Sequence, residues 1–144
     1  MCKFNTIIAA IIFICSISYS QDIVGKIYSN TEADSLYGPV LTFISIPCDQ
    51  LNNLTSQTTN YLMFGILNGN LTILGDKRVV LYPESTEISQ QDVFRYFSIS
   101  LIQKIIKEGN SSMISIELRN NGIITITNGN YTLENGVFCP PFCN

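Results

Sequence analysis

Short apolar runs separated by turn-forming residues constrain the fold of this chain more than any other feature of its sequence. The runs are rich in β-branched and aromatic residues, and Asn-Gly, Gly-Pro or Pro stands at their ends. Runs of this length and spacing are typical of the antiparallel strands of a sandwich or barrel. We therefore predict an all-β fold, a single antiparallel β-sandwich or jelly-roll-like domain. The predicted strands cover residues 22–29, 38–47, 61–67, 71–74, 78–83, 113–118, 123–127 and 131–134.

The segment between the fifth and sixth of these strands carries signals of both helix and strand. Ser89 and Asp92 occupy the positions of a helix-capping box. Further on, apolar residues alternate with serines, and the many Ile, Phe and Tyr residues favour a strand over a helix. We predict a strand over residues 96–106 that pairs with 113–118, together with a short helix near 89–94. A helix that starts at Ser89 and continues through the segment is the alternative.

The motif Asn-Gly-Asn-X-Thr occurs twice, at residues 68–72 and 128–132, each time between apolar runs. Asn-Gly fits a two-residue type I′ turn, because both central residues of that turn need a positive φ. We interpret the two copies as similar hairpins whose Asn-Gly dipeptides form exposed tips. The match between the copies fades beyond the hairpins. An eroded tandem repeat and a paired ligand site are the two alternatives.

Alternation along the two outgoing strands predicts which of their side chains are buried. Leu71 and Tyr131 follow the second asparagine of each motif, and we expect both to point into the core. Thr72 and Thr132 come one residue later, so we expect them on the solvent-facing side of the strands.

The first 20 residues show the three parts of a secretory signal peptide. Lys3 precedes an apolar run at residues 7–15, and Ser18 and Ser20 supply the small residues before a cleavage site. The run is shorter than the roughly 20 apolar residues that a membrane-spanning helix needs. We therefore predict a signal peptide at 1–20 and a single secreted, extracellular β domain at 21–144, with no transmembrane anchor.

Four Asn-X-Ser/Thr triplets lie in the predicted mature chain. They begin at Asn53, Asn70, Asn110 and Asn130. Such triplets are acceptors for N-glycosylation in secreted proteins. We predict glycans at all four asparagines. They would also increase the solubility of a chain in which only 13% of the residues are charged.

The charge balance argues against one class of partner. Removing Lys3 from the eight basic residues leaves seven, against eleven acidic ones, so the predicted mature chain has a net charge of −4. An acidic chain without a basic cluster has little to attract a phosphate backbone. We predict no nucleic-acid partner.

Three cysteines remain after the predicted cleavage, namely Cys48, Cys139 and Cys143. An odd number in an oxidising compartment leaves one thiol free or engaged with another molecule. We predict a disulfide from Cys48 to Cys139 or Cys143, which would close a loop of roughly 90 residues and stabilise the fold by about 4–5 kcal/mol on the chain-entropy model. The remaining cysteine makes a disulfide-linked dimer an open alternative.

The absence of histidine from the sequence excludes several chemistries. Ser-His-Asp and Cys-His nucleophiles, histidine general bases and His-containing zinc sites all require that residue. Two carboxylate pairs remain, Glu84 with Glu87 and Glu32 with Asp34, and their polar surroundings indicate solvated loop acids rather than a catalytic pair.

Calcium is the one metal that this composition accommodates, through loop oxygens such as those of Asp49, Asn52 and Asn53. Their spacing does not resemble an EF-hand loop. We therefore predict no metal, no cofactor and no enzymatic activity.

Three functions from different classes fit these observations. The first is a secreted, N-glycosylated, non-catalytic binding module for a cell-surface protein or glycan, by analogy with other small extracellular β domains. The second is a structural or matrix glycoprotein, which the odd cysteine would cross-link. The third is a small hydrolase or a hydrolase inhibitor. We favour the binding module.

Overall fold

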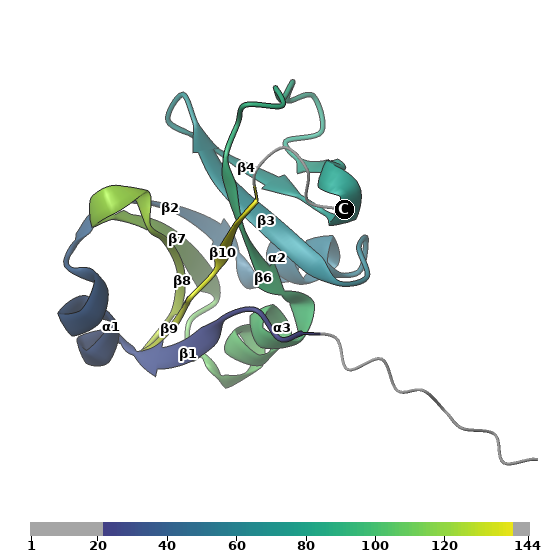
Figure 1. Ribbon diagram of the computed structural model, residues 1–144. Helices are drawn as coiled ribbons and strands as arrows, with labels where there is room; N and C mark the ends of the chain where they lie inside the picture. The colour runs from purple at the N-terminus through teal and green to yellow at the C-terminus, as the bar shows by residue number, and fades with distance from the viewer. Residues whose placement is uncertain (1–21, 140–144) are drawn as a thin grey trace, which may run out of the picture.

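The computed structural model describes residues 22–139 as two five-stranded antiparallel sheets packed in a sandwich-like arrangement, with three short helices (Figure 1). The predicted signal peptide and Cys143 lie outside the described residues. Sheet 1 has the order β1-β9-β8-β7-β2. Its strands are β1 (Lys26–Ser29), β2 (Val40–Pro47), β7 (Met113–Arg119), β8 (Ile124–Asn128) and β9 (Tyr131–Glu134).

Sheet 2 has the order β10-β6-β3-β4-β5. Its strands are β3 (Tyr61–Leu67), β4 (Asn70–Leu74), β5 (Val80–Tyr82), β6 (Phe94–Ser98) and β10 (Val137–Cys139). The helices are α1 (Asn30–Tyr37), α2 (Cys48–Thr55) and α3 (Ile99–Glu108), with 3₁₀ turns η1 (Asp76–Arg78) and η2 (Asn120–Gly122). Among residues 22–139, no helix is long and apolar enough to cross a membrane.

All eight predicted strands are present, with ends that shift by up to four residues, but the all-β prediction is wrong because of the helices. Helix α2 buries Leu51 and Leu54, and α1 buries only Ala33. Helices of eight residues form in a protein mainly through tertiary packing, because so short a helix is unstable alone. Helix α1 has one buried position and α2 has three, counting Thr55. So few positions leave little periodic signal in the sequence, and neither helix was predicted.

The ambiguous segment divides into a strand and a helix at Ser98. The prediction of a strand over 96–106 is correct only up to that residue, because β6 ends there and α3 follows. Ile102 and Ile105 are completely buried on one side of α3, and this packing outweighs the strand propensity of the residues. Strand β6 also pairs with β3 and β10 instead of the predicted neighbour β7.

The predicted short helix near 89–94 is absent, although its capping hydrogen bonds form. The Ser89 N–H donates to Asp92 Oδ2 at 2.7 Å, and the Gln91 N–H donates to Ser89 Oγ at 3.1 Å. These bonds close a turn rather than begin a helix, because the chain enters β6 at Phe94.

The chain contains an internal structural repeat. The order β2-α2-β3-β4-β5 is followed by the same order in β6-α3-β7-β8-β9. The first strands of the two units are exchanged, since β2 pairs with β7 of the second unit and β6 pairs with β3 of the first. Each sheet therefore contains three strands of one unit and one strand of the other.

The strand registers of the two units agree residue by residue. The pair Ile46–Ile114 between β2 and β7 corresponds to Phe97–Leu62 between β6 and β3. The following hairpins agree in the same way, with Phe64–Ile73 corresponding to Ile116–Ile126 and Ile66–Leu71 to Leu118–Ile124. Equivalent residues are 51–53 positions apart.

The two Asn-Gly-Asn motifs are not equivalent in this repeat, because their spacing is 60 residues. Both lie in hairpins as predicted, one between β3 and β4 and the other between β8 and β9. In the first, Asn68 (φ 51°) and Gly69 (φ 80°) form the tip, as a type I′ turn requires. In the second, the loop is Gly129 (φ 59°) and Asn130, the pattern of a type II′ turn.

The predicted burial around these hairpins is correct for only one of four side chains. Leu71 is buried as predicted, whereas Tyr131 is 40% exposed. Thr72 and Thr132 are both buried, against the prediction. The two threonines are buried because the outer face of each sheet is also covered at these positions. Thr132 donates a hydrogen bond to Asn30 Oδ1 of α1 at 2.9 Å.

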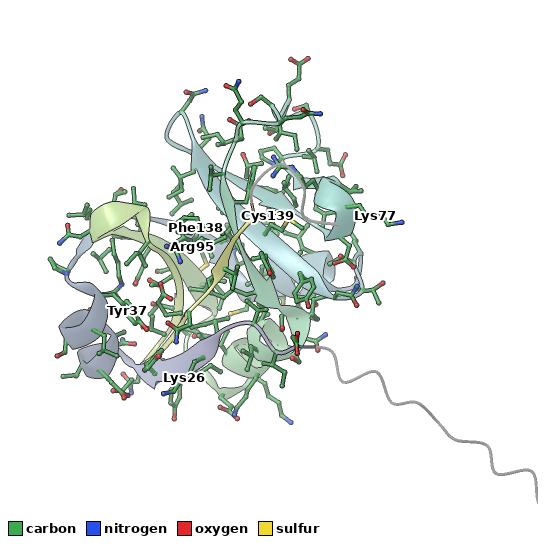
Figure 2. The ribbon with its side chains drawn as sticks, viewed as in Figure 1. Lys26, Tyr37, Lys77, Arg95, Phe138 and Cys139 are labelled. Atoms are coloured by element: carbon green, nitrogen blue, oxygen red, sulfur yellow. The ribbon has the colours of Figure 1, made fainter. Side chains whose placement is uncertain are left out.

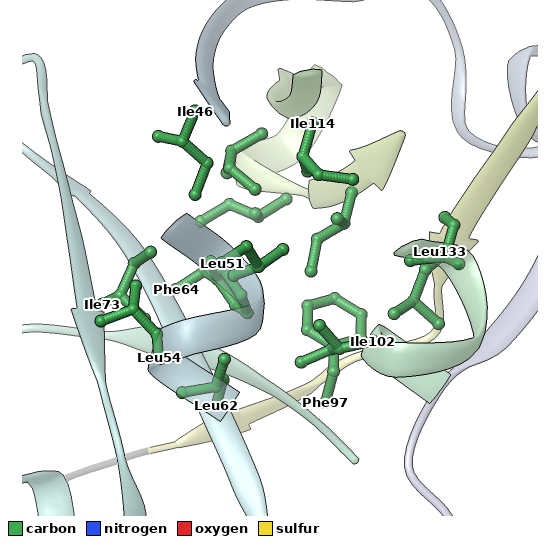
Figure 3. Packing of buried hydrophobic residues seen from close by; sticks show 14 of the residues in the cluster. Ile46, Leu51, Leu54, Leu62, Phe64, Ile73, Phe97, Ile102, Ile114 and Leu133 are labelled. Carbon is green, nitrogen blue, oxygen red and sulfur yellow. The ribbon is translucent and has the colours of Figure 1, made fainter. Parts of the chain in front are cut away.

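The main core lies between the two sheets and against α2 and α3 (Figure 3). Equivalent positions of the two units fill it, including Leu51 with Ile102, Leu54 with Ile105 and Leu62 with Ile114. A smaller apolar cluster of Met63, Leu74, Phe94 and Cys139 covers the other side of sheet 2. The corresponding side of sheet 1 is polar, and the candidate site lies there.

Candidate functional site

Strand β2 ends sheet 1 on one side, and its outer edge pairs with no strand among residues 22–139. Phe43 and Leu41 are each 61% exposed, and Val40 is also exposed. With polar side chains of β2 and β7 they form a groove of about 520 Å³. It is lined by Val40, Leu41, Thr42, Phe43, Ser115 and Glu117. We call this feature the β2 groove.

The direction of the β2 backbone follows from one hydrogen bond at its end. The Cys48 N–H donates to Ser112 O on the β7 side at 2.9 Å. Because successive backbone groups of a strand alternate in direction, the N–H and C=O groups of Ile44 also face β7, and those of Phe43 and Ser45 face outward. Pro47 has no N–H to expose. The open edge therefore presents the backbone of Phe43 and Ser45.

A buried ionic cluster supports the floor of the β2 groove. Arg119 is 2% exposed and donates from Nη2 to Glu117 Oε2 at 3.0 Å and from Nε to Thr125 Oγ1 at 3.1 Å. Its Nη1 donates to Asp34 Oδ1 and to Gly38 O, both at 2.6 Å. These bonds fix α1 and the start of β2 against sheet 1, and they leave the groove carboxylate of Glu117 paired.

The same side of sheet 1 carries a second polar network, further from the groove. Tyr37 Oη lies 2.7 Å from Asn135 Oδ1, and Asn135 Nδ2 donates to Tyr28 Oη at 2.8 Å. Burial and the hydrogen bond with Tyr28 raise the pKa of Tyr37 above its ordinary value. Burial also raises the pKa of Glu134, and the charge of Arg95 partly opposes this shift. These groups hold the tail of β9 and α1 together.

The predicted disulfide from Cys48 does not form, because Cys48 is a free cysteine in the structure and Cys139 is disulfide-bonded elsewhere. The Cys48 thiol lies 3.3 Å from Ser111 O and 3.7 Å from Asn128 Nδ2. Burial, followed by the charge of Asp49, raises its pKa. Helix α2 begins at Cys48 and holds it beside Ser111 and Ser112, just before β7.

All four predicted glycan acceptors are exposed. Asn53 lies on α2, Asn70 begins β4, Asn110 follows α3 and Asn130 is in the β8–β9 turn. None of them belongs to β2 or β7, so the strands that form the β2 groove contain no acceptor.

The remaining sequence candidates do not meet in one site. Glu84 and Glu87 are exposed between β5 and β6. Asp34 does not act as a partner of Glu32, because it pairs with Arg119. The proposed calcium ligands Asp49, Asn52 and Asn53 lie on α2 rather than in a loop. Within residues 22–139 there is no group of three Cys, Asp or Glu side chains arranged to hold a metal ion.

Sequence reasoning missed both the β2 groove and the Glu117–Arg119 cluster. One signal for the groove was present, because apolar residues of β2 occupy both of its faces, as Phe43 and Ile44 show. That pattern indicates a strand covered on both sides, and only the structure shows that one side is open. The chain matches no protein-family model, no curated protein and no solved structure.

Proposed function

We propose that this protein is a secreted, N-glycosylated, non-catalytic binding module that recognises a protein partner through the β2 groove. One observation carries the proposal. Phe43 is 61% exposed on β2, the edge strand of sheet 1, whereas Phe94, its equivalent in the internal repeat, is completely buried on β6, where β10 pairs with it. The difference between the two equivalent aromatic residues supports a partner that would cover Phe43.

The exposed apolar side chains of β2 supply surface that a partner can cover. Covering a Phe or Leu side chain stabilises a complex by about 1.5–3 kcal/mol before the costs of association. Leu41, Phe43 and Val40 are contiguous on a strand that contains no charged residue. Natural edge strands prevent pairing with other chains by charged side chains, by proline or by bulges. Strand β2 has a register irregularity between Val40 and Thr42 and ends in Pro47, but residues 43–45 carry none of these features. This short stretch therefore fits a strand that is used for binding.

The paired state of Glu117 also favours a binding surface. Its carboxylate accepts hydrogen bonds from Arg119 at 3.0 Å and from Thr125 at 2.8 Å. A carboxylate with two such partners beside the groove need not be neutralised by the incoming molecule. The groove therefore suits an uncharged, apolar segment better than a cation or a phosphate.

The extracellular part of the proposal depends on the sequence. It is supported by the signal-peptide pattern and by the four acceptor asparagines, which are all exposed on the folded chain. N-terminal sequencing of secreted material, with peptide mapping after glycosidase treatment in heavy-oxygen water, tests both points. An intact N-terminus and unlabelled asparagines would contradict them.

The binding proposal is tested with matched surface variants. We expect Phe43→Ser to abolish retention of extracellular proteins by the immobilised chain, and Val79→Ser to leave it unchanged. Val79 is a suitable control because it is 57% exposed and lies beside β5 of the other sheet. A glycan array tests the alternative ligand class. Equal retention by both variants, or glycan binding that ignores Phe43, would contradict the assignment to the β2 groove.

A further inference from the structure

We infer that the partner of the β2 edge is a second copy of this chain, which pairs its own β2 antiparallel to the first. The inference rests on the proposed function, because it names the occupant of the same surface. Three features support it: the covered edge of β6 in sheet 2, the edge of β2 that no strand of residues 22–139 pairs with, and the self-complementarity of β2.

The molecule itself shows how a strand covers the equivalent edge. Strand β10 pairs antiparallel with β6, placing Cys139 opposite Phe94 and Val137 opposite Tyr96. Between them, Arg95 faces Phe138, and the guanidinium carbon lies 3.9 Å from the ring centroid (Figure 2). The next outward N–H of β6, that of Ser98, donates to Val24 O at 2.9 Å. The edge of β6 is thus completely occupied.

The equivalent edge of β2 has the same backbone groups, and among residues 22–139 no strand receives them. Phe43, Ile44 and Ser45 correspond to Phe94, Arg95 and Tyr96 in the aligned registers. Pro47 corresponds to Ser98, and it has no N–H that would need the acceptor supplied by Val24. An antiparallel strand opposite residues 43–45 would therefore complete sheet 1 in the way that β10 completes sheet 2.

A second β2 fits this requirement because the window 43–45 is complementary to itself. With a two-fold axis at Ile44, Phe43 of one copy lies opposite Ser45 of the other. Both residues have outward N–H and C=O groups, so each pair exchanges two hydrogen bonds. The two Phe43 rings then lie diagonally across the new ladder, at a separation of about 7–8 Å that aromatic side chains bridge.

The charges of the chain do not oppose this pairing. Strand β2 contains no charged residue, so no like charges are placed opposite each other in the ladder. The nearest carboxylate in the groove, that of Glu117, is paired with Arg119 in each copy. The product is one continuous sheet formed from both copies, in which each Phe43 is covered. Such a contact is a homodimer interface.

The test uses the complete secreted chain and three surface variants. Sedimentation equilibrium should show a dimer for the parent and for the control Val79→Lys. It should show a monomer, or a dissociation constant raised at least about tenfold, for Phe43→Lys. Ser45→Pro removes an outward N–H and should have the same effect. Circular dichroism spectra that match the parent would show that both variants are folded.

Amide hydrogen exchange distinguishes this dimer from any other. The N–H groups of Phe43 and Ser45 should be protected at dimeric concentrations and should exchange rapidly after dilution. The N–H of Ile44 serves as the internal control, because it faces β7 and should stay protected throughout. A parent that is monomeric at about 100 µM, or a dimer whose Phe43 and Ser45 amides exchange freely, would overturn the inference.

Failure of the inference is distinguishable from failure of the proposed function. A monomeric parent that still retains another protein in a Phe43-dependent manner would rule out pairing with a second copy but would support the proposed binding function. Retention that is indifferent to Phe43, in a chain that is also monomeric, would remove both.

Discussion

Equivalent strands of the internal repeat form the outer faces of the two sheets, yet one face is apolar and the other is polar. In sheet 2, the positions of Met63, Gly65 and Leu67 lie beneath an apolar cover that includes Phe94 and Cys139. The equivalent positions in sheet 1 are Ser115, Glu117 and Arg119, which lie beneath the polar contacts of α1. The residues that face the common core are apolar in both sheets.

This difference shows which parts of the repeat are constrained. The inner positions pack against α2, α3 and the other sheet, so each must be apolar and of suitable size. The outer positions meet different covers, and their chemistry follows the cover. Strand β10 pairs with β6 in sheet 2, whereas no strand of the described residues 22–139 pairs with the outer edge of β2 in sheet 1. The divergence of the two halves is concentrated where we place the binding surface.

The largest expected effect on stability comes from replacing Arg119 of the polar outer face with an apolar residue. Arg119→Leu leaves the carboxylate of Glu117 buried without its cation, and we expect a loss of about 3–5 kcal/mol of unfolding free energy. The double variant Glu117→Leu/Arg119→Leu removes the stranded charge and should recover most of that loss. Urea denaturation of both proteins measures the difference. If the double variant were as unstable as the single one, the charge would not be the cause.

The two Asn-Gly-Asn motifs allow a smaller and sharper comparison. Asn128 is completely buried, accepts from the Ser111 N–H at 3.0 Å and donates to Ile105 O at 3.2 Å. Asn128→Ala leaves both groups without a partner and should cost about 1–3 kcal/mol.

The matched control is Asn68, the first residue of the other motif, which is exposed in the turn at φ 51°. Asn68→Ala should cost about 1 kcal/mol or less, through the strain of alanine at positive φ. Thermal melting compares the two. Equal losses of stability would contradict the finding that Asn128 is buried whereas Asn68 is exposed, although both are the first residue of the same motif.

Gly65 lies on the apolar outer face of sheet 2, at the position equivalent to Glu117 in sheet 1. A Cβ at this position would lie 2.7 Å from the ring of Phe94, which is completely buried. We expect Gly65→Ala to lower the unfolding free energy by about 1–3 kcal/mol through overpacking. The same change in a Phe94→Leu background should cost less, as measured by urea denaturation. An undiminished cost would show that the ring is not responsible.

The smallest effect concerns Glu134, whose pKa is raised by burial above the ordinary value of 4.5. The folded chain therefore binds a proton more readily than the unfolded chain does. Stability falls as the pH rises from the unfolded to the folded pKa, and it stays lower above that range. We expect Glu134→Gln to melt at a higher temperature than the parent at pH 7 and at nearly the same temperature below about pH 4.

Calorimetry at the two pH values checks this sign. The exposed residue Glu84 provides the control, and Glu84→Gln should change the melting temperature little at either pH. A Glu134→Gln variant that is less stable than the parent at pH 7 would mean that its contacts with Arg95 and Gly136 outweigh the effect of burial.

Most of the strands were predictable because their apolar runs and the turn residues between them are local patterns. Tyr61–Leu67 and Met113–Arg119 are short, β-branched or aromatic runs between turn residues, and the structure places β3 and β7 there. Helices α1 and α2 were not predictable in the same way. Each is eight residues long, and each depends on contacts with distant strands more than on its own propensity.

The candidate site shows the same division between local and distant information. The sequence identified exposed asparagines such as Asn70, because an acceptor triplet is a local pattern. It did not identify Phe43 as an exposed residue, since the exposure of a strand residue depends on which strand lies beside it. Nor did it pair Arg119 with Asp34, which is 85 positions away along the chain.

By itself the sequence determined where the strands run, where the hairpins turn and which chemistries require a residue that the chain lacks. Spacing and side-chain type carry that information within a few residues. Only the tertiary structure decided that β2 and β6 exchange units, that Cys48 remains a free thiol and that, within residues 22–139, β6 gains an outer neighbour while the equivalent β2 does not. Those outcomes depend on which distant segments form hydrogen bonds with a given strand, and a local sequence pattern does not contain that information.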